Sequence, residues 1–113
     1  MEECPVGRVA HLLGNKWALL IIRDLASGFK RFGELQRSMG HISPRTLSAR
    51  LSTLEEAGIV ERRAYAEIPP RVEYSLTEKG RALLPLLHAM RDYGEKWLRP
   101  ILNCQTEPDK FER

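Results

Sequence analysis

Apolar side chains recur at helical spacing along most of the chain, and one stretch, from 59 to 76, shows the alternation of strands instead. The spacing predicts a first helix over 5–13, with Pro5 at its start, and a short third helix that Gly40 ends. Between them, the segment 16–25 is apolar nearly all round. A helix of that kind is typical of the centre of a core, so we expect the other elements to pack around it.

A fourth helix is predicted over 44–57. Ser43 offers a hydroxyl cap, and Pro44 suits the first helical position because its fixed backbone angle fits the helix and its missing N–H needs no partner. The buried stripe of this helix consists of Leu47, Leu51 and Leu54.

After Ile59 the apolar period becomes two. The segments 59–65 and 71–76 therefore read as the strands of a hairpin, with Pro69-Pro70 in its tip. A last helix is expected from 78 to about 102, capped by Thr77 and kinked near its start by Pro85. Helices, a two-stranded hairpin and a flanking helix in this order describe a winged helix, a mainly α (α+β) variant of the helix-turn-helix.

Composition narrows the class of protein. With 113 residues, 42% hydrophobic and 29% charged, the chain fits a single folded domain and neither a disordered nor a membrane-embedded protein. The longest apolar run, 17–22, is far shorter than a bilayer crossing requires. The acidic start lacks the features of a secretion signal, so we expect a cytoplasmic protein.

Positive charge is concentrated in one segment. The net charge is only +3, but the stretch 28–54 holds five Lys and Arg residues against the single Glu34. At 100° per residue, the outward side of the fourth helix is basic at its start, small and hydroxylated, which suits contact with a DNA groove. The alternatives are an ordinary cap at Ser43 and solvated surface charges.

We expect the DNA contacts to come from Lys30, Arg31, Arg37, Ser43, Pro44, Arg45, Thr46, Ser48, Ala49, Arg50, Thr53, Arg63 and Arg71. Because side chains alternate along a strand, only one of Arg62 and Arg63 is expected to face the DNA.

Several separate motifs, in order, closely resemble those of the HxlR-type winged-helix regulators, relatives of the MarR group. They are Cys4-Pro5, Gly14-Asn15-Lys16-Trp17, Phe32-Gly33-Glu34-Leu35, Ile42-Ser43-Pro44-Arg45-Thr46-Leu47, Leu54-Glu55-Glu56-Ala57-Gly58-Ile59-Val60-Glu61-Arg62 and Pro69-Pro70-Arg71-Val72-Glu73-Tyr74-Ser75-Leu76-Thr77. The resemblance covers 4 to about 98. It implies a bacterial or archaeal dimeric transcription regulator that binds an inverted-repeat operator, usually as a repressor. By the same resemblance, 44–57 is the recognition helix and the hairpin tip near 66–71 belongs to the wing.

A dimer is also expected from the terminal helices, about 5–13 and 77–102. A last helix of some 25 residues would be nearly 40 Å long, at about 1.5 Å per residue, and would outrun a small core. Its far end is apolar, so it needs a second surface. The alternative is packing against the first helix of the same chain. The expected interface residues are Val6, Val9, Leu13, Met90, Tyr93, Trp97 and Ile101.

Cys4 stands directly before Pro5, at the positive end of the first helix, where a thiolate is favoured. The resemblance implies a sensing role, because some similar regulators use a cysteine at this position to detect electrophiles or oxidants. An inert thiol is the alternative, and a Cys4–Cys104 bond between subunits is a further hypothesis.

Other chemistries find little support. His11, His41 and His88 are not at metal-ligand spacing, and no nucleophile with a base and an orienting group is visible. We therefore expect no metal, no cofactor and no enzymatic activity, although an oxidant or small-molecule effector fits the family. The rival hypothesis is a winged helix that docks a protein instead of double-stranded DNA.

Overall fold

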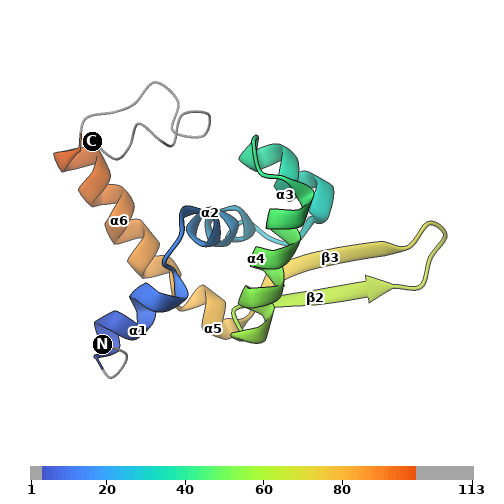
Figure 1. Cartoon of the computed structure of the whole chain (residues 1–113), viewed down its shortest axis with the longest axis horizontal. Coiled ribbons are helices and arrows are strands. Elements are labelled where there is room, and N and C mark those ends of the chain that lie inside the picture. Colours follow the sequence, from blue (N-terminus) through green and yellow to red (C-terminus); the bar gives the residue numbers. More distant parts are fainter. Residues whose placement is uncertain (1–3, 99–113) are drawn as a thin grey trace.

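The computed structural model describes residues 4–98 and has the order of elements of a winged helix (Figure 1). The elements are α1 (Pro5–Leu12), α2 (Lys16–Leu25), β1 (Lys30–Arg31), α3 (Phe32–Met39), α4 (Pro44–Glu56), β2 (Val60–Tyr65), β3 (Arg71–Leu76), α5 (Glu78–Arg81) and α6 (Leu84–Trp97). The first four predicted helices and both predicted strands are confirmed, with ends that differ by one residue at most.

The central helix is α2, as its apolar sequence predicts. Asn15 caps it, accepting a hydrogen bond from the Ala18 amide at 2.8 Å. Ile21, Ile22 and Leu25 have no exposed surface. The core continues through α3, α4 and the base of the hairpin, and its other buried members are Leu13, Ala18, Leu35, Met39, Ile42, Leu47, Leu51, Leu54, Ile59, Val60 and Leu76.

The sheet has three strands, in the order β1-β3-β2, and both pairings are antiparallel. The predicted hairpin joins Val60 opposite Leu76 to Tyr65 opposite Arg71. The additional strand β1 has two residues, Lys30 and Arg31, which pair with Tyr74 and Glu73. So short a strand has no period of its own, and it forms because β3 offers a free edge beside it.

The last helix predicted from 78 to about 102 is interrupted near its start, where Pro85 predicts a kink, but the interruption is a complete break between two helices. The chain forms the short α5 and the separate helix α6, with a break at 82–83. Pro85 has no N–H to bond the carbonyl four residues earlier, so the helix restarts there, with Pro85 in its first turn. At about 1.5 Å per residue, α6 is about 21 Å long. The predicted extension beyond 98 lies outside the described residues.

The elements place two surfaces far apart. The wing, formed by β2 and β3, extends to one side of the molecule, whereas α1 and α6 lie at the opposite side, with α4 between them (Figure 1). In residues 4–98 no helix combines the length and the apolar character that crossing a membrane needs.

Candidate nucleic-acid interface

The start of α4 is fixed by Ser43. Its Oγ accepts a hydrogen bond from the Thr46 amide at 3.1 Å and donates one to the Thr46 Oγ1 at 2.9 Å. Its carbonyl accepts from the Leu47 amide at 2.9 Å. Because Pro44 has no N–H, the amide of Arg45 is the donor that remains in the first turn for a phosphate.

The outward side of α4 has the composition that the sequence predicts. Leu47, Leu51 and Leu54 are buried, and the residues between them reach solvent. Ser43, Pro44, Arg45, Ser48, Ala49, Ser52 and Thr53 are exposed, and Thr46 and Arg50 are half-buried. A helix with a single exposed arginine and small neighbours offers little obstruction to a groove wall.

Two side chains on α4 are constrained in ways that the sequence does not reveal. The hydroxyl of Thr53 donates to the Ala49 carbonyl at 3.1 Å, so it offers only its lone pairs outward. The Nε of Arg50 is buried and donates to no acceptor among the described residues. Its guanidinium is therefore incompletely bonded in this structure.

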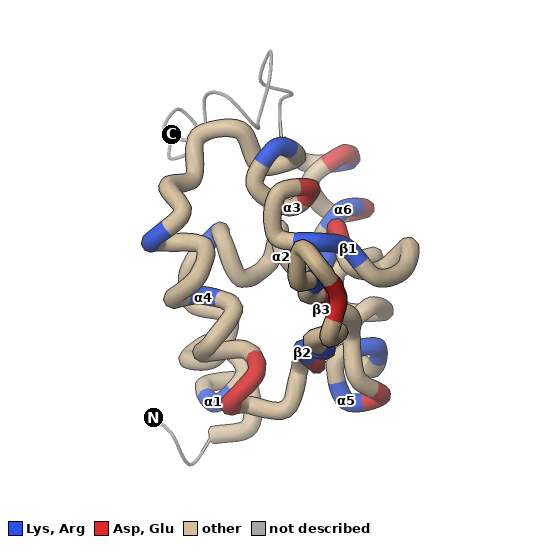
Figure 2. The backbone as a smooth tube through the Cα atoms, turned by 90° about the vertical axis from the view of Figure 1, so that its right-hand side faces the viewer, with Lys and Arg blue, Asp and Glu red and all other residues tan. Residues whose placement is uncertain are grey.

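The predicted cations of β1 and α3 lie beside the start of the helix-turn-helix. The amide of Arg31 donates to the Glu34 carboxylate at 2.8 Å, which fixes the first turn of α3. Lys30 donates to the Ser27 hydroxyl at 3.1 Å. Arg31 and Arg37 share a shallow surface hollow with Phe29. Figure 2 shows basic positions on β1, α3 and α4 and acidic ones at the far end of α4.

The arginines Arg63 and Arg71 of the wing both form ion pairs with carboxylates of the wing. Arg62 and Arg63 are both exposed, and Arg63 donates to the Glu61 carboxylate at 3.1 Å, which raises the pKa of Arg63. Arg71 lies over the Tyr65 ring, with its guanidinium carbon 4.1 Å from the ring centre. It also contacts Glu67 at 3.1 Å and Glu73 at 3.7 Å. The sequence predicts Arg71 as a DNA contact and gives no sign of these partners.

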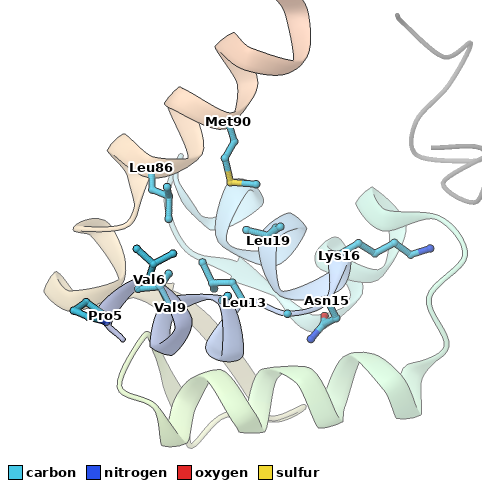
Figure 3. A pocket seen from close by; sticks show the side chains of 11 residues that line it. Pro5, Val6, Val9, Leu13, Asn15, Lys16, Leu19, Leu86 and Met90 are labelled. Atoms are coloured by element: carbon cyan, nitrogen blue, oxygen red, sulfur yellow. The ribbon is translucent and has the colours of Figure 1, made fainter. Parts of the chain in front are cut away.

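An apolar groove separates α1, α2 and α6. Val6 and Val9 of α1 point toward Leu86 and Met90 of α6, with Leu19 on the floor (Figure 3). Neither α1 nor α6 contains a fully buried side chain. Val6 is 76% exposed, Met90 46%, Tyr93 60% and Trp97 65%.

Two predicted interface residues stand apart from this exposed set. Leu13 belongs to the core and only borders the groove. Ile101 lies outside the described residues.

Cys4 is exposed and occupies the position that precedes α1, as predicted. Its backbone carbonyl accepts from the Arg8 amide at 2.9 Å. Cys104, its hypothetical disulfide partner, lies outside the described residues. Within 4–98, no three His, Cys, Asp or Glu side chains gather into a group that would hold a metal ion.

Comparison with known proteins decides the family. The model of the HxlR-like helix-turn-helix family matches residues 12–102. The chain belongs to this family. The chain is accordingly a DNA-binding transcriptional regulator of the MarR-like winged-helix type.

Relatives and solved structures agree with this assignment. A helix-turn-helix-type transcriptional regulator of Synechocystis is 48% identical over 95 residues, which cover 84% of this chain and 70% of the relative. A MarR-family regulator from Porphyromonas gingivalis has a TM-score of 0.82 and 39% identity, and the match covers 87% of this chain and 96% of that one. The redox regulator HypR in its oxidized form has a TM-score of 0.80 and 41% identity, covering 87% and 100%.

Proposed function

We propose that two copies of this chain bind an inverted-repeat operator, with one α4 in the major groove of each half-site. The observation that carries the proposal is the outward side of α4, which is exposed, small and hydroxylated around Arg45. Side chains of this kind approach base edges without a steric obstacle, and arginine recognises guanine with two donors.

The other basic residues hold the phosphates on either side of the major groove. Lys30, Arg31 and Arg37 flank the start of the helix-turn-helix, and Thr46, Ser48, Ala49, Arg50 and Thr53 line the groove beside Arg45. On the wing, Arg63 and Arg71 contact the backbone or the minor groove. Arg71 must then exchange Glu67 for a phosphate, because that carboxylate already contacts one of its terminal nitrogens at 3.1 Å.

The second copy covers the groove between α1 and α6. Val6, Val9, Met90, Tyr93 and Trp97 are partly or largely exposed and apolar, and a patch of this kind marks an interface. Pairing two copies through this surface leaves each α4 and each wing uncovered, since they lie elsewhere on the molecule (Figure 1). A two-fold dimer then presents two recognition helices about 34 Å apart, one turn of DNA.

The proposal is tested with duplexes recovered from a random pool by in vitro selection with the intact protein. We expect an inverted repeat that binds two chains, with an affinity that falls steeply as salt rises because phosphate contacts release counterions. Equal binding to every duplex with a flat salt response would contradict the proposal and favour a winged helix that docks a protein.

We propose further that Cys4 makes the regulator responsive to oxidants or electrophiles. Cys4 is exposed and directly precedes Pro5, which lines the groove, so we expect a modification there to reach the dimer surface. The similarity to the redox regulator HypR is compatible with this role. N-Ethylmaleimide, which adds to the thiolate, is expected to change operator affinity in the wild type and not in Cys4→Ser. An unchanged affinity in the alkylated wild type would contradict it.

A further inference from the structure

The end of the recognition helix is held by the segment that follows the wing. After α4, the chain presents three consecutive backbone carbonyls, those of 57–59. The Lys79 ammonium donates to the Ala57 carbonyl at 2.7 Å. The Thr77 hydroxyl donates to the Gly58 carbonyl, and the Thr77 amide donates to the Ile59 carbonyl at 3.0 Å.

Gly80 brings the two segments into direct contact. A Cβ at this position would lie 2.3 Å from the Ile59 carbonyl oxygen, a distance that no side chain tolerates. The Gly80 amide also donates to the Thr77 hydroxyl oxygen at 3.0 Å, so Thr77 caps α5 while it bonds the chain after α4. We call Thr77, Lys79 and Gly80 the carbonyl clamp.

The clamp joins the three parts of the molecule that the proposed function uses. Thr77 follows the last wing residue, Leu76, and α5 is two residues from α6, which carries the proposed dimer surface. The ammonium of Lys79 also lies at the negative end of the α4 dipole, a favourable position for a cation. Hydrogen bonds therefore run without a long gap from the start of α6, through 82–83 and α5, to the end of α4.

We propose that the carbonyl clamp is a positioning device: it holds each recognition helix at a set angle to the dimer helix α6 and thereby fixes the half-site spacing that the dimer accepts. The inference rests on the proposed function. Thr77, Lys79 and Gly80 touch no DNA in this arrangement and act through α4.

The test uses the intact protein and two duplexes, the selected inverted repeat and the same repeat with one base pair inserted at its centre. Wild-type protein is expected to bind the lengthened repeat at least about fivefold more weakly, because the insertion rotates and shifts one half-site. Lys79→Met keeps the apolar stem and removes the donor. The quantity to compare is the affinity for the selected repeat divided by that for the lengthened repeat. We expect the logarithm of this ratio in Lys79→Met to be at most about half of its wild-type value.

Controls separate positioning from a general loss of stability. Arg81→Met removes a cation from the same short helix and is expected to keep the wild-type ratio, whereas Lys79→Arg, which restores a donor, is expected to recover it. Binding to a duplex with a single half-site should stay within about twofold for all three variants. Gly80→Ala, which forces α5 away from Ile59, should bring the affinity ratio closer to one than Lys79→Met does.

An unchanged ratio in folded Lys79→Met would overturn the inference, and so would an equal loss on all duplexes. If Gly80→Ala does not fold, Lys79→Met decides alone. Failure of the proposed function is recognised separately, because the wild-type protein would then select no repeat, and the positioning role would fall with it.

Discussion

The arginine side chains predicted to contact DNA differ in their exposure and in their bonding partners within the chain. Arg45 is exposed on α4, Arg50 is half-buried with an unbonded Nε, and Arg71 is held by two carboxylates and a ring. Arg45 is therefore the side chain with the lowest cost of rearrangement on binding. We assign Arg45 the base-reading role, keep Arg50 at the groove beside it and assign Arg71 to the backbone or the minor groove.

Replacing Arg45 by alanine is expected to weaken operator binding by about 1–3 kcal/mol, since a bidentate contact to a guanine is lost. Binding to an unrelated duplex should change much less. Fluorescence anisotropy with both duplexes measures the difference, and Arg81→Ala, an exposed arginine on α5, is the matched control. Equal losses on both duplexes would reassign Arg45 to the phosphates.

Glu67→Gln is expected to strengthen binding to every duplex, because it removes one carboxylate that competes with phosphate for Arg71. An exposed pair of this kind is worth about 0.2–1 kcal/mol, so the gain is at most about fivefold at low salt. Titrations at two salt concentrations measure it. A weaker complex would show that the Arg71–Glu67 contact is needed to shape the wing.

At this scale, the sequence identifies which residues are candidates and leaves their partners undetermined. The outward positions of α4 follow from helical period alone, and their exposure is confirmed. The pairing of Arg71 depends on the register that sets Tyr65 opposite it, and on a turn that brings Glu67 back. Lys79 was overlooked because its acceptor is a backbone carbonyl 22 positions away.

Among the elements, α4 depends most visibly on one local interaction. Its buried stripe is short, and its first turn is organised by the Ser43 side chain and carbonyl. The clamp holds the opposite end of the same helix. The structure thus fixes α4 at both ends, which a helix that reads a groove with a defined orientation would need.

Ser43→Ala is expected to lower the free energy of unfolding by about 1 kcal/mol, because the Thr46 amide loses its acceptor. Ser43→Asp should retain the cap and most of the stability but weaken DNA binding, since a carboxylate then faces the phosphates. Urea unfolding and operator titration separate the two effects. Full stability in Ser43→Ala would show that the cap is dispensable.

The sequence predicts an element correctly where the spacing of apolar residues agrees with the capping and breaking residues at its ends. The helices 5–13, 16–25 and 44–57 and the hairpin strands have both, and the structure confirms them. The strand β1 lacks a local signal of this kind, and for the break before α6 the signal of Pro85 predicts only a kink. The first is formed by an edge of β3, and the second by a proline whose effect on the earlier carbonyl cannot be weighed against packing from sequence.

For the molecule as a whole, the separation of surfaces is the organising feature. The apolar groove of α1 and α6 lies apart from the wing and from the outward side of α4 (Figure 1). One surface is therefore available for a second chain while the other meets DNA. The length argument for dimerisation does not apply to α6 as observed, and the exposed apolar side chains now carry that expectation alone.

Met90→Glu is expected to dissociate the dimer, raising its dissociation constant by at least about 100-fold, because an unpaired carboxylate would be buried at the interface. Sedimentation velocity measures the change. His88→Glu places the same carboxylate at an exposed position on the opposite side of α6 and serves as the control. If Met90→Glu remains dimeric, the groove is not the interface.

The absence of any fully buried side chain from both α1 and α6 has a consequence for the regulator in a cell. Helices of this length gain little from their own backbone bonds, so most of their stability comes from what covers them. In the proposed dimer the second chain covers them, so we expect their melting temperature to rise with the concentration of the protein itself. We then expect the expression level to govern how many chains are paired, as well as how many operators are filled.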